Sequence, residues 1–163
     1  MNNHFTIFIP SFNCEHWVQK NIQSVKEQTY QNFDVMYVDD FSTDKTYEQA
    51  KAYSSSNVKV HKNSFNKGKM CNMFEHINKM RDDTIVVILD GDDWLYNNLV
   101  LEKLNAIYKE DVWMTNGSYI VNTTSEVVTP NTPVGYWQGN IRQKSWEFSH
   151  LGTFRKKLFS KIK

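Results

Sequence analysis

The sequence is poor in cysteine and has no long apolar segment, and both shortages narrow the class of protein. Its two cysteines, Cys14 and Cys71, form neither a metal-binding spacing nor a disulfide framework. Such sparse use of cysteine favours a reduced, cytoplasmic setting. The N-terminus lacks a basic segment, and the apolar run 5–10 is too short for a signal peptide or a membrane span. We therefore expect no membrane-spanning segment.

The sequence also lacks an excess of either charge. It has 19 Lys and Arg against 18 Asp and Glu, a net charge of +1. This balance gives no electrostatic basis for attraction to nucleic acid, so no nucleic-acid partner is expected. Aromatic residues, at 14%, fit a surface that handles carbohydrates or nucleotides, although such residues more often fill a core. Lysine outnumbers arginine sixteen to three. That bias is typical of AT-rich genomes. The expected cytoplasmic setting therefore includes the cytoplasm of a host cell, with the chain encoded by a virus.

Glycine is scarce as well, with six residues, and no Gly-x-Gly-x-x-Gly follows the first apolar segment. Its absence argues against a dinucleotide-dependent oxidoreductase. What is present is a regular alternation of patterns. Predicted strands lie at 5–9, 33–38, 58–61 and 85–89, and amphipathic helical patterns follow them from about residues 15, 46, 69 and 97. This order predicts an α/β fold, a mostly parallel sheet with helices on both faces, in one domain spanning 1–163.

The helical patterns predict which residues reach the core. The helix after Gly68 is expected to bury Met70, Met73, Phe74, Ile77 and Met80, and the helix at about 97–108 to bury Val100, Leu104 and Ile107. From residue 112 the pattern changes. Residues 118–128 read as an edge strand or hairpin, 129–140 as a loop, and the chain after Leu151 as a helix.

Polar residues follow three of the predicted strands at the point where each ends. They are Pro10-Ser11-Phe12-Asn13, Asp39-Asp40 and Asp90-Gly91-Asp92-Asp93. Because parallel strands put their carboxyl ends at one edge of the sheet, these groups are expected to converge there. Asp39 or Asp40 can accept from a nucleotide base, Asp90 from ribose hydroxyls, and Asp92 can bind a hard cation that carries phosphate oxygens. The alternative is a solvated acidic turn that only ends a strand.

Two other meanings of the Asp-x-Asp sequence are disfavoured. In a calcium loop, Leu95 would stand where a glycine is needed and Leu101 where a bidentate acid is needed. In phosphohydrolases with this sequence the pair opens the fold, whereas here it follows the fourth strand. Trp94 also stands two positions after the second Asp, where a hydroxyl residue is expected.

At this point the chain resembles a known family. Residues 8–13, Tyr37-Val38-Asp39-Asp40-Phe41-Ser42-Thr43-Asp44-Lys45-Thr46, Asn66-Lys67-Gly68 and Leu89-Asp90-Gly91-Asp92-Asp93 occur in order and at familiar distances. Together they are similar to the nucleotide-binding half of inverting family-two glycosyltransferases with the GT-A fold. The resemblance covers about 1–95 and leaves about 96–163 as a truncated acceptor-side half.

The resemblance implies a role for each matching position. Pro10, Ser11, Phe12 and Asn13 would hold the base, which Asp39 would contact, with Asp40 as a further partner. Lys67 would lie near the base or the pyrophosphate. Asp90 and Gly91 would contact the donor, and Asp92, with Asp90, would bind Mn²⁺ or Mg²⁺. The implied partners are a nucleotide-sugar donor, with a UDP-sugar favoured, and a carbohydrate acceptor.

The catalytic base has no clear place in this sequence. The family usually places an Asp or Glu beyond the segment that resembles 149–155, and the chain ends first. Glu110-Asp111 precedes a strand and is assigned to surface charge, which leaves Glu147. His150 would complete the metal site or contact phosphate, or it is a hydrogen-bonded histidine at a helix start. We expect a fragment of a longer transferase. A short chain with altered chemistry and a nucleotide-sugar-binding module without transferase activity are the alternatives.

Overall fold

A six-stranded sheet forms the centre of the computed structural model, which describes residues 2–129, 151–159 and 161. The strand order is β3-β2-β1-β4-β8-β5. Four strands run parallel, and β8 is antiparallel to both β4 and β5. The bounds are β1 (His4–Ser11), β2 (Phe33–Asp39), β3 (Val58–Lys62), β4 (Thr84–Ile88), β5 (Met114–Thr115) and β8 (Gly152–Arg155). The mostly parallel sheet expected from the alternating pattern is confirmed. A separate hairpin pairs β6 (Tyr119–Ile120) with β7 (Val127–Val128), inside the segment predicted as an edge strand or hairpin.

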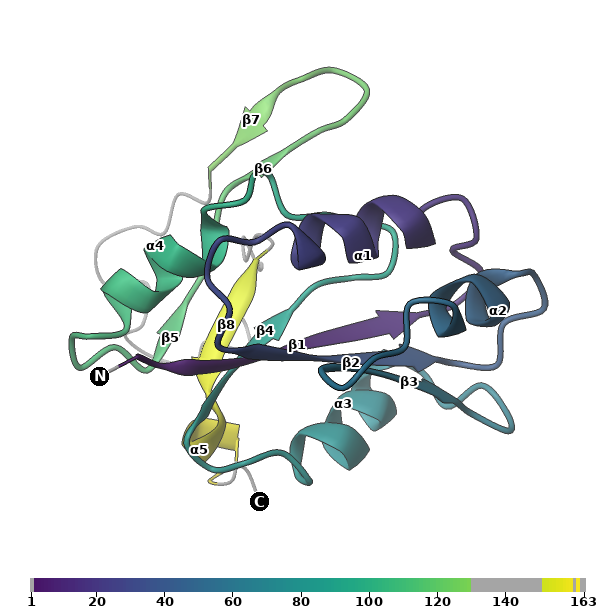
Figure 1. Cartoon of the computed structure of the whole chain (residues 1–163), viewed down its shortest axis with the longest axis horizontal. Coiled ribbons are helices and arrows are strands. Elements are labelled where there is room, and N and C mark those ends of the chain that lie inside the picture. The colour runs from purple at the N-terminus through teal and green to yellow at the C-terminus, as the bar shows by residue number, and fades with distance from the viewer. Residues whose placement is uncertain (1, 130–150, 160, 162–163) are drawn as a thin grey trace, which may run out of the picture.

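Helices cover both faces of the sheet (Figure 1). α1 (Val18–Lys26), α2 (Thr46–Lys51) and α4 (Val100–Ile107) pack on one face, and α3 (Lys69–Ile77) and α5 (Lys156–Phe159) on the other. The buried side chains of β1 alternate between these layers. Phe5, Ile7 and Ile9 join the cluster under α1, and Phe8 joins the cluster under α3. A strand buried on both faces reads as the continuous apolar run seen in the sequence.

The apolar face of α3 differs from the predicted one. Ile77 is buried and Met73 and Met80 are partly buried, but Met70 is 73% exposed and Phe74 is 59% exposed. The reason is that Asn72 and His76, one turn apart, take buried positions beside Ile77. The inward face of the helix is therefore rotated away from Met70 and Phe74.

The buried face of α4 is also shifted. Ile107, expected in the core, is 45% exposed, whereas Leu101 is fully buried and Leu104 nearly so. Leu101, Leu104 and Tyr108 follow the i, i+3, i+7 spacing of one helix face, and Val100 packs at its margin. The apolar residues of this segment are compatible with two inward faces, one through Val100 and Ile107 and one through Leu101 and Tyr108. Packing against the sheet selects the second face.

The segment after Leu151 forms strand β8 before the short helix α5, so the predicted helix there is wrong at its start. β8 fills the edge of β4, where its Thr153 hydroxyl lies 2.8 Å from the Tyr108 hydroxyl and 2.6 Å from Thr115 Oγ1. Arg155 donates to the carbonyls of Val112 and Tyr108. These partners are distant in sequence, which is why local periodicity missed the strand.

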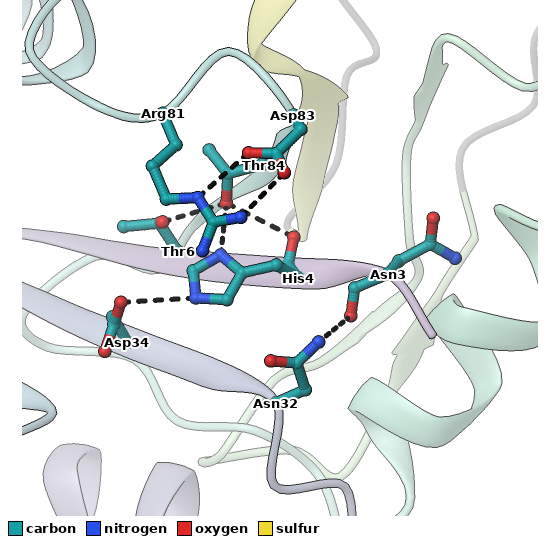
Figure 2. A network of polar contacts seen from close by, with 8 residues as sticks. All are labelled: Asn3, His4, Thr6, Asn32, Asp34, Arg81, Asp83 and Thr84. Carbon is teal, nitrogen blue, oxygen red and sulfur yellow. Dashed lines mark hydrogen bonds and ion pairs between the residues drawn. The ribbon is translucent and has the colours of Figure 1, made fainter. Parts of the chain in front are cut away.

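Polar side chains join the strands at their amino-terminal edge. Figure 2 shows His4 between β2 and β4, with Nδ1 2.9 Å from Thr84 Oγ1 and Nε2 3.2 Å from the Asp34 carboxylate. Thr84 Oγ1 also lies 2.9 Å from Thr6 Oγ1, and Arg81 forms a two-bond pair with the Asp83 carboxylate. The polar groups at the amino-terminal edge of the sheet therefore form hydrogen bonds and ion pairs with one another.

No helix in the described part of the chain has the length and apolar character needed to cross a membrane.

Candidate functional site

The carboxyl ends of β1, β2 and β4 meet at one edge of the sheet, as the strand order requires. Ser11 is in register with Asp39, and the Asp40 N–H donates to the Ser11 carbonyl over 2.8 Å. On the other side of β1, the Gly91 N–H donates to the Pro10 carbonyl over 3.1 Å. Backbone hydrogen bonds thus bring together the three segments that the sequence singled out.

Ser11 and Pro10 lie inside this edge, whereas Phe12 and Asn13 are exposed. The Ser11 hydroxyl accepts a 2.7 Å hydrogen bond from Tyr37, and burial strongly raises the pKa of that phenol. Gly91 packs directly against Ser11, since a Cβ at position 91 would come within 2.7 Å of Ser11 Oγ. The site therefore has a tightly packed floor made of Ser11, Tyr37 and Gly91.

Gly91→Ala is expected to lower the free energy of unfolding by about 1–3 kcal/mol, because an added methyl in a filled space forces its neighbours to shift. Gly152→Ala is the matched control, since a Cβ there meets nothing within 4 Å. Urea denaturation of both variants measures the difference. Equal stability of the two variants would contradict the close packing.

The loop after β1 is bonded to the loop after β2. The Asn13 N–H donates to Ser42 Oγ over 2.9 Å, and Asn13 Oδ1 accepts from the Thr43 N–H over 2.9 Å. Asn13 and Phe41 both have positive φ, 53° and 68°, and for a bulky residue such as Phe41 this backbone conformation is strained. Each loop also carries an exposed phenylalanine, Phe12 at 47% and Phe41 at 46%. The two loops thus form one braced unit with aromatic rings at its surface.

Asp39 holds a buried acceptor at this edge. The residue is fully buried, and its Oδ2 accepts from the Ser42 N–H over 3.2 Å. Its Oδ1 is buried without a hydrogen-bond partner among the described residues. A buried carboxylate oxygen is costly unless a donor meets it. The arrangement therefore suits a ligand that brings an N–H group to Asp39.

Asp40 instead bonds to the chain itself. Its carboxylate accepts from the Lys67 N–H (2.9 Å), the Gly68 N–H (2.7 Å) and the Asn63 side-chain amide (2.8 Å). Burial acts to raise the pKa of Asp40, but these hydrogen bonds and that of Asn72 outweigh it and lower the pKa. Asp40 thus holds the turn that leads into α3. The nucleotide contact expected from the sequence stays a prediction.

Asp40→Asn is expected to lower the free energy of unfolding by about 2 kcal/mol at neutral pH, because an amide offers one oxygen to three N–H donors. Because folding lowers the pKa of Asp40, the difference in free energy of unfolding between the wild type and the variant is fully present above the ordinary pKa of 3.8. It is lost as the pH falls through the folded value. Denaturant titrations at pH 7 and in increasingly acidic buffer measure this, and a difference that stayed constant across that range would contradict the role of the carboxylate.

Two lysines of the same turn form ion pairs. Lys67 Nζ bonds to Glu75 over 2.7 Å, and this hydrogen bond raises the pKa of the lysine. Lys69 Nζ bonds to both oxygens of Asp90, at 2.5 and 2.7 Å. Lys67 was among the site residues predicted from the sequence, and Lys69 was not. The available signal was a second lysine two residues after Lys67, at the start of a predicted helix.

Asp92 is exposed and forms no hydrogen bond or ion pair with the described residues. Burial, as the main cause, raises the pKa of the Cys14 thiol, and the charges of Asp92 and Asp44 add to that rise. Asp92 therefore lies within electrostatic reach of the loop after β1. Glu147 and His150 lie outside the described residues.

A divalent cation would be held here only together with a ligand. Within residues 2–129, 151–159 and 161, no three His, Cys, Asp or Glu side chains are grouped as a metal site. Mg²⁺ and Mn²⁺ need no such group, since they bind through one or two carboxylates and complete their shell with phosphate and water. The exposed carboxylate of Asp92 has the chemistry for such a cation, while both oxygens of Asp90 are bonded to Lys69, so the cation site expected at Asp92 and Asp90 stays a prediction.

Comparison with known proteins identifies the family of this sheet and its edge. The family model described as glycosyl transferase family 2 matches residues 6–161. The chain belongs to glycosyl transferase family 2. The family resemblance seen in the sequence is thereby confirmed.

Curated relatives extend well beyond the matched part. The chain is 32% identical over 124 residues to the Escherichia coli UDP-Glc:alpha-D-GlcNAc-diphosphoundecaprenol beta-1,3-glucosyltransferase WfgD, covering 75% of this chain and 48% of that protein. It is 30% identical over 135 residues to a Methanococcus voltae dolichyl N-acetyl-alpha-D-glucosaminyl phosphate 3-beta-D-2,3-diacetamido-2,3-dideoxy-beta-D-glucuronosyltransferase, covering 76% and 41%. This family 2 chain thus spans about half the length of those relatives.

Solved structures confirm the GT-A fold. Staphylococcus aureus TarS 1–349 in complex with UDP-GlcNAc superposes with a TM-score of 0.77 at 21% identity, covering 96% of this chain and 46% of TarS 1–349. The mannosyltransferase PcManGT from Pyrobaculum calidifontis, in complex with GDP-Man and Mn²⁺, gives 0.71 at 16% identity, with 99% and 47% covered. At these identities the likeness establishes the fold of this family 2 chain.

Proposed function

We propose that the chain carries the donor site of a glycosyltransferase that moves a sugar from a nucleoside-diphosphate donor to a hydroxyl of a glycan acceptor. The single observation that carries this proposal is the edge itself. A family 2 sheet places a buried oxygen of Asp39, which has no hydrogen-bond partner among the described residues, and the acidic turn Asp90–Asp93 at the ends of β2 and β4, the two strands that flank β1. A UDP-sugar is the favoured donor, supported by the UDP-glucose of one relative's name and the UDP-GlcNAc bound to TarS.

Asp39 is the proposed contact for the base. Its Oδ1 would accept from an N–H of the base, a bond that the buried oxygen lacks within the described chain. Phe12 and Phe41 carry exposed rings on the two loops that flank this position, where a flat base would find an apolar surface. Pro10, Ser11 and Asn13 would shape the loop rather than bind through their side chains, because those of Ser11 and Asn13 bond to Tyr37 and Thr43.

Asp92 and Asp90 are the proposed ligands of a divalent cation, Mn²⁺ or Mg²⁺. When bound, the cation would neutralise the negative charge that develops on the leaving diphosphate. Lys69, the first residue of α3, pairs with Asp90 and so brings a positive charge to the acidic turn, while the ammonium of Lys67 is paired with Glu75. His150 is a further candidate for the cation or the phosphate.

Transfer with inversion also needs a base that takes the proton of the acceptor hydroxyl. Glu147 is the candidate within this chain, and the family's usual carboxylate would belong to the remainder of a longer protein. The donor site and the base are thus separate parts of the proposal, and they can be tested separately.

The first test is calorimetric titration of UDP, GDP and dTDP into the purified chain, with Mn²⁺ and then with EDTA. The proposal expects one nucleotide to bind, and to bind more tightly with Mn²⁺. Incubation of the matching nucleotide-sugars with glycan acceptors then measures transfer. Binding without turnover would favour a nucleotide-sugar-binding module. Absence of binding to a folded chain would contradict the donor site.

A further inference from the structure

A buried amide on α1 holds the acidic turn from behind. Asn21 is fully buried. Its Nδ2 donates to the Asp90 carbonyl over 2.9 Å and to the Asp93 carbonyl over 2.7 Å. The two hydrogens of the amide therefore meet the carbonyls of the first and last residues of the Asp-Gly-Asp-Asp turn.

The turn is closed on its other sides by the backbone. The Asp93 N–H donates to the Asp90 carbonyl over 3.0 Å, and the Gly91 N–H donates to Pro10 in β1. Asn21 adds the link between this turn and α1. The backbone that carries Asp90 and Asp92 is therefore held by three contacts: one to β1, one within the turn and one to α1.

The identity of the side chain matters at this position. An amide nitrogen has two hydrogens to offer, whereas an aspartate would turn only acceptors toward two carbonyl oxygens. Asn21 Oδ1 has no hydrogen-bond partner among the described residues, so the two carbonyls set the orientation of the amide. The position therefore requires a short side chain with two donors.

Two more polar side chains, one in α1 and one just beyond its end, hold the later part of the same loop and the start of α4. Ser24 Oγ accepts from the Leu95 N–H over 3.0 Å. Gln28 donates to the Asn97 carbonyl over 2.6 Å and accepts from the Leu101 N–H over 3.0 Å. Asn21 and Ser24 lie in α1 and Gln28 follows the end of that helix, and within the described residues Asn21 is the one of these three whose side chain bonds to the turn that holds the carboxylates.

We propose that Asn21 is a positioning residue for the donor site, which keeps Asp90 and Asp92 in the geometry that binds the diphosphate and its cation. This inference rests on the proposed function of those carboxylates. Residues that orient metal ligands typically change metal affinity by about 10–100-fold when they are replaced. Asn21 acts through the backbone of the turn and does not touch the donor.

The test compares Asn21→Ala with Gln28→Ala, which removes an equally buried amide just beyond the end of α1 that bonds to Asn97 and Leu101 and not to the acidic turn. UDP, GDP and dTDP are titrated into each folded variant with Mn²⁺ and with EDTA. For Asn21→Ala we expect the gain in affinity that Mn²⁺ provides to fall by about tenfold or more. Binding in EDTA should be unchanged. Gln28→Ala should keep the full gain. Asn21→Ser, which retains one donor, is expected to lie between them and serves if the alanine variant does not fold.

Three outcomes overturn the inference. The first is an unchanged Mn²⁺ gain in the Asn21 variants while the wild type shows one. The second is an equal loss in the Asn21 and Gln28 variants, which would make Asn21 a structural residue like Gln28. The third is a loss of equal size with and without Mn²⁺. A wild-type chain that shows no Mn²⁺-dependent binding overturns the proposed donor site as well, so the two failures are distinguishable.

Discussion

Asp92→Ala is expected to remove the Mn²⁺-dependent part of nucleoside-diphosphate binding and to leave the fold intact. Asp92 is exposed and forms no bond with the described residues, so its loss leaves no buried group unpaired. As a direct cation ligand it should have an effect at or above the upper end of that of an orienting residue, about 100-fold. Calorimetric titration with Mn²⁺ measures the affinity, and urea denaturation measures the stability.

Asp111→Ala is the matched control for Asp92→Ala. Asp111 is an exposed carboxylate that lies just before β5, toward the amino-terminal edge of the parallel strands, so its removal changes the net charge equally. It should leave binding unchanged. Equal Mn²⁺-dependent affinity of the Asp92 variant and the wild type would place the cation elsewhere. A similar loss in both variants would indicate a general electrostatic effect, and the loss would then shrink in high salt.

The convergence of the strand ends was predictable from the sequence because it depends on few variables. The buried strand before Asp90 is an apolar run of β-branched residues, and alternation with helices makes the sheet parallel. A parallel sheet then puts Pro10, Asp39 and Asp90 at one edge whatever the details of packing. Strand position and direction were enough.

The roles of the individual carboxylates were harder to predict, because each depends on what reaches it from another part of the chain. Asp39 and Asp40 are adjacent in sequence and both buried, yet Asp39 keeps an oxygen without a partner among the described residues and Asp40 receives three N–H donors. The difference arises from Asn63 and from the turn at residues 67–68, which lie more than twenty positions away. The sequence around Asp39 and Asp40 does not indicate these long-range contacts.

The same reason explains why the buried polar side chains in α1 and just beyond its end were not predicted. The apolar periodicity of Val18, Ile22 and Val25, at i, i+4 and i+7, matches the residues that α1 buries against the sheet. It does not predict that Asn21 and Gln28 are equally buried, since their partners are carbonyls of the loop at residues 90–97. Buried polar side chains reveal themselves only when the acceptors that satisfy them are placed.

Charge at the site is organised through these buried contacts. Asp40 fixes the turn at Lys67 and Gly68 by accepting both backbone N–H groups, and Lys69 follows that turn directly. Its ammonium then reaches the Asp90 carboxylate. The buried carboxylate of Asp40 thus positions the Lys69 ammonium against the Asp90 carboxylate at the edge of the sheet. A divalent cation that binds Asp90 would have to displace Lys69, whereas the exposed carboxylate of Asp92 is open to it directly.

Asp39→Asn is expected to weaken nucleoside-diphosphate binding by about 10–100-fold both with Mn²⁺ and in EDTA, because the lost interaction is with the base. The wild-type carboxylate offers one oxygen to the Ser42 N–H and another to the ligand. Asparagine offers a single oxygen, so either the loop or the ligand meets an N–H donor instead. Titration of UDP, GDP and dTDP under both conditions measures the loss.

The control for Asp39→Asn is Asp34→Asn, the same change on the same strand at its amino-terminal end, where the side chain pairs with His4. That variant should bind as the wild type does. The comparison with Asp92→Ala separates the two halves of the site. If Asp39→Asn weakened binding only in the presence of Mn²⁺, Asp39 would belong to the cation site and its contact with the base would be wrong. A loss of the same size in EDTA would support contact between Asp39 and the base. Together with the loss of Mn²⁺-dependent binding in Asp92→Ala, it would support a donor site in which the end of β2 binds the base and the acidic turn after β4 binds the cation.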